Sequence, residues 1–149
     1  MQLCFEMFAI RFETPQHGWL PIELLVADQR LMFHASDVAP NFLEGLVVAL
    51  DAFLDGQVST VEIFEEPALH ELTFTTKSGK GLLQIKLDGV LTPIEFEGPK
   101  VKIALTCWRA LRELEGRVEQ KAFDEHWLGF PNKQVAALGQ KIKKLQHID

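Results

Sequence analysis

The sequence predicts an α+β fold: an antiparallel sheet of six to seven strands, one helix packed on a face of that sheet, and a C-terminal helical segment. Two observations support this. Between residues 19 and 96, short segments of alternating apolar and polar side chains flank one amphipathic segment. After residue 99 the apolar residues recur at helical spacing instead. Burying both patterns requires helices layered on the sheet.

The strands before the helix are expected at Leu3–Glu13, Trp19–Val26 and Leu31–Ala35, the last two forming a hairpin. The first has apolar residues on both faces, which indicates a central position or coverage on both sides. Pro21 lacks a backbone N–H, so it should lie on an edge strand or at a strand start.

The amphipathic helix is expected at Pro40–Leu54, with Ser36 or Asp37 as its N-cap and Gly56 ending it. Strands then follow at Val58–Phe64, Leu69–Thr75, Gly81–Leu87 and Thr92–Phe96. The residues expected to be mostly buried are Phe8, Trp19, Phe33, Leu46, Leu50, Phe53, Phe74, Ile85, Leu105 and Trp108.

Helical spacing resumes at Lys100 and continues to about Glu115. Gly116 either breaks this helix or lies within a longer one. The sequence Gly129-Phe130-Pro131 is a stop signal, and a last helix is expected from about Asn132 to Gln146.

The length of 149 residues favours a single domain, residues 1–149, able to bury a substantial core. No apolar run approaches the roughly 18 residues that span a bilayer, and the N-terminus lacks the basic start of a secretory signal. We therefore expect a cytoplasmic protein that does not bind membranes.

Cys4 and Cys107 should be buried free thiols, with one disulfide as the alternative.

Charge is distributed unevenly along the chain. Residues 1–98 hold 15 acidic and 5 basic residues, a net charge of −10, whereas residues 99–149 hold 6 and 10, a net charge of +4. Nucleic-acid binding is disfavoured, because it requires Lys and Arg to neutralise phosphates. An acidic strand-rich region would instead attract a basic protein partner. The alternative is that the acidic residues only keep the domain soluble.

No catalytic signature is present, and we expect no cofactor and no metal. The segment 77–81, Lys-Ser-Gly-Lys-Gly, lacks the spacing of a phosphate loop and is better explained as a hairpin turn. The five histidines contain no closely spaced pair typical of a metal site. His70 alternates with apolar neighbours, which suggests a histidine at a strand end or at the edge of the core.

An acidic group around Pro67 is the remaining candidate site. Acid–base catalysis, a docking patch for a basic partner and an ordinary polar rim are all open interpretations. We expect binding without turnover, and the predicted partner-binding residues are Glu62, Glu65, Glu66 and Glu71.

The pattern of anchors resembles the WapI-type immunity proteins of bacterial toxin systems. The resemblance covers roughly residues 18–97 and rests on Gly18–Leu24, Phe33–Ser36, the helix Phe42–Leu54, Val61–Pro67 and Gly81–Leu87. It implies a small bacterial cytoplasmic protein that binds and blocks a toxin domain and has no catalysis of its own. The two helices from residue 100 onward depart from the family, whose sheet would continue there.

Two other functions remain open. A small-ligand or regulatory domain would have a pocket between sheet and helices, and its marker would be a cavity lined by Phe8, Phe74 and Trp108. An enzyme would bring carboxylates or histidines together at the floor of a pocket.

Overall fold

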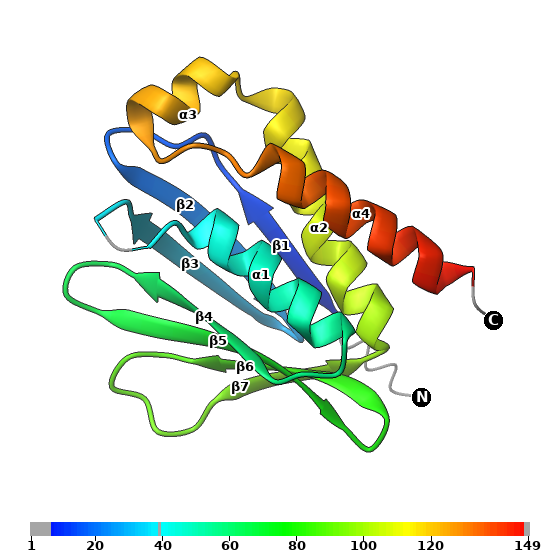
Figure 1. The fold of residues 1–149 in the computed structure, drawn as a ribbon. Coiled ribbons are helices and arrows are strands. Elements are labelled where there is room, and N and C mark those ends of the chain that lie inside the picture. Colours follow the sequence, from blue (N-terminus) through cyan, green and yellow to red (C-terminus); the bar gives the residue numbers. More distant parts are fainter. Residues whose placement is uncertain (1–6, 39, 148–149) are drawn as a thin grey trace.

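The computed structural model describes residues 7–38 and 40–147. These residues form seven strands and four helices (Figure 1). In chain order they are β1 (Phe8–Phe12), β2 (Trp19–Val26), β3 (Gln29–Ser36), α1 (Phe42–Leu54), β4 (Ser59–Phe64), β5 (Leu69–Lys77), β6 (Lys80–Lys86), β7 (Ile94–Gly98), α2 (Lys100–Arg117), α3 (Gln120–His126) and α4 (Asn132–Gln146).

The fold is α+β, as predicted, but the strands form two antiparallel sheets. One has the order β1-β2-β3 and the other the order β4-β5-β6-β7. The prediction of a single sheet of six to seven strands is therefore wrong. The physical reason lies at the edge of β3, where the backbone N–H of His34 donates to the side chain of Glu65 at 2.8 Å. A carboxylate thus occupies a position that a backbone carbonyl of β4 would take in a continuous sheet.

β2 is the central strand of its sheet, so Pro21 does not lie on an edge strand; it is the third residue of β2, close to the strand start. The carbonyl of Pro21 accepts a hydrogen bond from the N–H of Glu13 at 3.1 Å, so the ring nitrogen faces the same side. The ladder of β1 ends at Phe12, opposite Ile22. Pro21 therefore lies where the pairing with β1 ends, and its missing N–H leaves only the one bond from Glu13 at that point.

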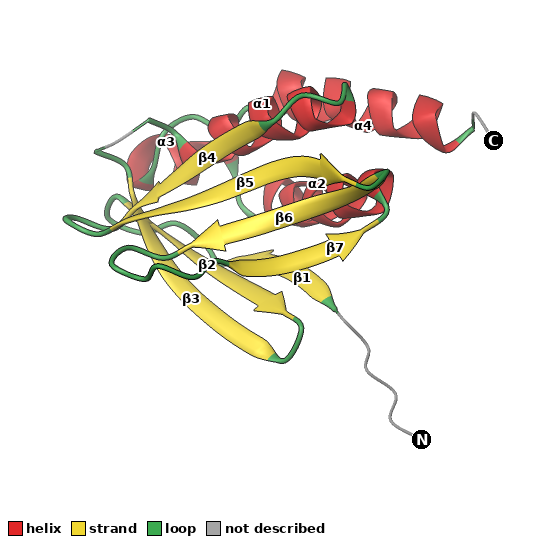
Figure 2. Cartoon of the chain, turned by 90° about the horizontal axis from the view of Figure 1, so that it is seen from below, coloured by secondary structure: helices red, strands yellow, loops and turns green. Residues whose placement is uncertain are grey.

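α1 is the central helix of the molecule. It packs against β4 and also contacts α2 and α4, and Figure 2 shows α1 and α4 above the strands. Its cap is Asn41, not Ser36 or Asp37: the Asn41 side chain accepts from the N–H of Leu43 at 3.0 Å. This is a normal capping bond. The expected end is confirmed, because Gly56 follows the helix with a φ of +82°.

The helical tail packs on the core. α2 continues through Gly116 to Arg117, and the short α3 follows it. α2 lies against β1 and β6, and α4 lies against α2 and α1. The indole N–H of Trp108 donates to the carbonyl of Val135 at 2.9 Å, and Lys141 pairs with Asp51 at 2.9 Å. The first of these bonds joins α2 to α4, and the second attaches the basic helical segment to α1 in the acidic part of the chain.

One hydrophobic core contains residues from both sheets and from all four helices. Six of the ten predicted core residues are buried: Phe33, Leu46, Leu50, Phe53, Phe74 and Ile85. Phe8, Leu105 and Trp108 are partly buried.

Trp19 is 37% exposed, so its predicted burial is wrong. The alternation of β2 turns Leu20, Ile22, Leu24 and Val26 inward, which leaves Trp19 on the outer face.

Cys107 is a free, buried thiol. Burial raises the pKa of this thiol well above its ordinary value, so it stays protonated and unreactive at neutral pH. Cys4 and the rest of residues 3–6 of the predicted strand Leu3–Glu13 lie outside the described residues, and β1 occupies Phe8–Phe12 of that strand.

Candidate functional site

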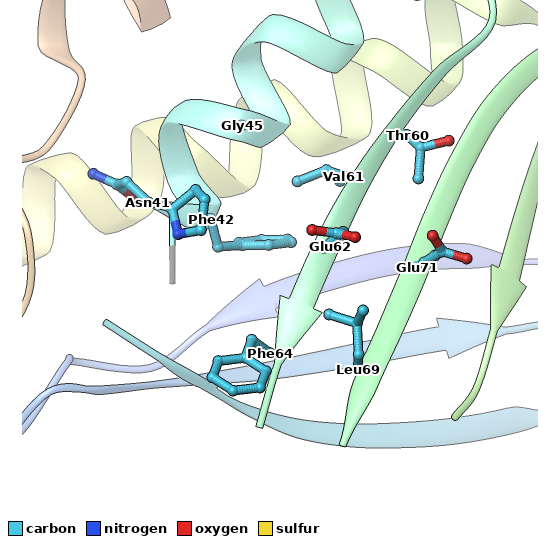
Figure 3. Close-up of a pocket in the computed structure, with 10 residues that line it drawn as sticks. Asn41, Phe42, Gly45, Thr60, Val61, Glu62, Phe64, Leu69 and Glu71 are labelled. Carbon is cyan, nitrogen blue, oxygen red and sulfur yellow. The ribbon is translucent and has the colours of Figure 1, made fainter. Parts of the chain in front are cut away.

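A pocket of about 570 Å³ lies between the start of α1 and the β4–β5 hairpin (Figure 3). Gly45 allows α1 to approach β4 closely, because an added Cβ would lie 3.0 Å from a methyl carbon of Val61. The pocket is lined by Pro40, Asn41, Phe42, Gly45, Thr60, Val61, Glu62, Phe64, Leu69 and Glu71. It therefore combines apolar walls with two of the four predicted glutamates.

Glu62 of β4 and Glu71 of β5 lie directly opposite each other in the antiparallel register. Like charges in this position destabilise a sheet. Lys86 lies opposite Glu71 on β6, but none of the ion pairs among residues 7–38 and 40–147 includes either glutamate. The ring of Phe42 points from α1 toward Glu62 (Figure 3). The pocket thus presents two neighbouring carboxylates beside an aromatic wall.

Glu65 and Glu66 have a different role from Glu62 and Glu71. They lie in the connection between β4 and β5, where the Glu66–Pro67 peptide bond is cis and Glu66 has a φ of +53°. Glu65 accepts from the backbone of β3, and Glu66 accepts from the hydroxyl of the buried Ser36. These two carboxylates join the two sheets. The four glutamates predicted to bind a partner therefore fall into two pairs, one that lines the pocket and one that bonds to the first sheet.

His70 organises this region from within. Its Nδ1 accepts from the backbone N–H of Asp88 at 3.0 Å, so Nε2 carries the proton and donates to Glu65 at 2.7 Å. Its ring lies 5.0 Å from that of Phe33, measured between centroids. His70 is buried at the start of β5, which confirms the predicted strand-end position. It links β5, β3 and the β6–β7 connection.

A second hollow, of about 540 Å³, borders the β4–β5 connection. It is lined by Trp19, His34, Glu65, Glu66, Pro67 and Ala68. The exposed indole of Trp19 is therefore adjacent to the acidic bend. Sequence reasoning missed this, although the alternation from Leu20 to Val26 already places Trp19 out of phase with the buried residues.

The markers for the two other functions give different results. Phe8, Phe74 and Trp108 line no common cavity: Phe74 is buried, Phe8 borders a hollow near β7, and Trp108 borders a groove between α2 and α4. Glu62 and Glu71 do converge on a pocket, but Glu62 is exposed to solvent. That setting differs from the apolar enclosure that tunes a carboxyl group for acid–base catalysis.

Within the described part of the chain, no three His, Cys, Asp or Glu side chains are placed to hold a metal ion. Nor does any helix there have the length and apolar character to cross a membrane. Comparison of the chain with protein-family models, with curated proteins and with solved structures found no match.

Proposed function

We propose that this protein is a non-enzymatic binding domain that holds a basic side chain of a protein partner in the pocket between α1 and the β4–β5 hairpin. The observation that supports this best is the opposed pair Glu62 and Glu71, which lines a pocket with apolar walls. Neutralisation of a toxin domain is the most specific form of this proposal, and it is supported by the sequence pattern of residues 18–97.

The pocket suits a Lys or Arg side chain in two respects. The aliphatic stem of such a residue packs well on apolar walls, here Phe42, Phe64 and Leu69. Its charged end would lie between Glu62 and Glu71, where charge-assisted hydrogen bonds replace the repulsion between the two carboxylates. A guanidinium fits best, because its planar fork reaches two carboxylates at once.

The wider charge distribution supports the same partner. A net charge of −10 over residues 1–98 speeds the encounter with a basic protein. The association rate should therefore fall as the salt concentration rises, because salt screens exposed charges beyond about 10 Å at 0.1 M.

A small cationic ligand is the second candidate. The pocket lies between a helix and a sheet, which is the arrangement expected of a ligand-binding domain, and the same carboxylates would bind a free amine or guanidinium compound. The two candidates differ in what binds: a small ligand would bind as a free compound, whereas a protein partner needs flanking residues for affinity.

Peptides selected on the intact protein from a random library test the proposal. We expect enrichment of Arg or Lys, and at least tenfold weaker binding of the selected peptides to the E62Q/E71Q variant, the loss typical of a removed charge-assisted contact. The matched control is E95Q/E97Q, which removes the same charge from β7, at the other edge of the same sheet. Selected peptides that bind E62Q/E71Q as well as the unaltered protein would contradict the proposal.

A further inference from the structure

Four connections between elements gather at one end of the molecule. They join β1 to β2, β3 to α1, β4 to β5 and β6 to β7, and both views place them on the left (Figures 1 and 2). We call this set, with the strand residues Trp19, Leu69 and Glu71 beside it, the loop end. The end of α4 lies on the opposite, right-hand side in both views.

Large apolar side chains are exposed at the loop end. Leu91 in the β6–β7 connection is 96% exposed, and Val38 in the β3–α1 connection is 72% exposed. Trp19, Leu69 and Val90 are also exposed. Apolar side chains gathered on a protein surface mark interaction sites more often than single ones do.

Hydrogen bonds hold these connections in place. Asp88 is fixed by His70, and the N–H of Val90 donates to the carbonyl of Leu87 at 3.0 Å. The N–H of Asp37 donates to the carbonyl of Gly18 at 2.9 Å, which ties the β3–α1 connection to the β1–β2 turn. A surface fixed in this way loses little conformational entropy on binding.

Charge identifies the occupant of this surface. The four connections contain no Lys and no Arg, whereas Asp37, Glu65, Glu66 and Asp88 lie within them. A fifth acidic residue there, Glu13, is paired with Arg11 at 3.5 Å. An anionic membrane would be repelled by this end of the protein, because lipid surfaces recruit basic segments. A basic protein segment with its own apolar side chains complements both features.

We propose that the loop end docks an amphipathic, basic segment of a protein partner, with Trp19 and Leu91 as its apolar anchors outside the pocket of Glu62 and Glu71. This proposal rests on the proposed function and extends it. The pocket of Glu62 and Glu71 takes one basic side chain, and the apolar anchors supply most of the binding energy, as aromatic and aliphatic anchors do at protein interfaces.

A synthetic peptide of Leu and Lys with an amphipathic helical repeat is a defined probe for calorimetric titration of the intact protein. The W19S/L91S variant alters two exposed residues that do not line the Glu62/Glu71 pocket, and it should bind the peptide about tenfold more weakly, the loss expected for truncated interface anchors. The control V48S/V58S alters two exposed apolar residues elsewhere, on α1 and before β4, and should bind as the unaltered protein does. A Leu/Glu peptide of the same pattern should not bind.

The outcomes separate this proposal from the previous one. Weaker binding to E62Q/E71Q with unchanged binding to W19S/L91S would overturn the apolar anchors and leave the pocket standing. The reverse result would overturn the pocket and leave the loop end standing. Equal weakening by V48S/V58S, no binding of the Leu/Lys peptide, or binding of the protein to vesicles containing phosphatidylserine would overturn the loop-end proposal.

Discussion

Replacing Phe53 with alanine should lower the free energy of unfolding by about 3–5 kcal/mol, the range for a buried phenylalanine. Phe53 is fully buried on α1, and its ring lies 5.5 Å from that of Phe74, measured between centroids. A Cβ added at Gly81 would lie 2.9 Å from the tip of the Phe53 ring, so β6 packs closely against this side chain. Loss of the Phe53 ring would leave a cavity where α1 meets the sheet of β4 to β7. Urea denaturation followed by circular dichroism measures the effect.

Val48 provides the control for this substitution. It lies on the same helix but is 61% exposed, so V48A should change the free energy of unfolding by no more than about 0.5 kcal/mol. If F53A were as stable as V48A, the inward face of α1 would be wrongly assigned.

Replacing His70 with alanine should lower the free energy of unfolding by about 2–3 kcal/mol, because it removes a buried ring and the two hydrogen bonds that this ring makes. The N–H of Asp88 would lose its acceptor, and Glu65 would lose one of its two hydrogen bonds. Chemical denaturation measures the total effect, and hydrogen exchange should show a faster-exchanging Asp88 amide. The control is H34A, since His34 contributes its backbone N–H to the network and keeps it in the variant. Unchanged stability and exchange in H70A would show that His70 does not organise the loop end.

Local patterns predicted most elements of the fold. The amphipathic repeat of Phe42–Leu54 and the alternation of β2 both depend on neighbouring residues, and both elements occur in the structure. The division into two sheets could not be predicted in the same way. It depends on a bond between His34 and Glu65, which are 31 residues apart in the chain. Nothing in either local sequence indicates that these groups meet.

The candidate site was predicted only as a group of acidic residues. Sequence proximity placed Glu62, Glu65, Glu66 and Glu71 together without distinguishing them. Their different roles follow from strand register, which sets Glu62 opposite Glu71, and from the bend, which turns the other two carboxylates toward β3. The apolar anchors were missed for a related reason, because the exposure of Leu91 depends on which connections protrude from the fold.

Titration of the isotopically labelled, intact protein with N-acetyl-arginine amide, followed by NMR, tests the central claim most directly. We expect amide shifts to concentrate at Glu62, Glu71 and Gly45, to weaken as salt is added, and to disappear in E62Q/E71Q but not in E95Q/E97Q. Shifts spread evenly over the acidic surface, or centred on Glu95 and Glu97, would show that the pocket between α1 and the β4–β5 hairpin does not bind a basic side chain.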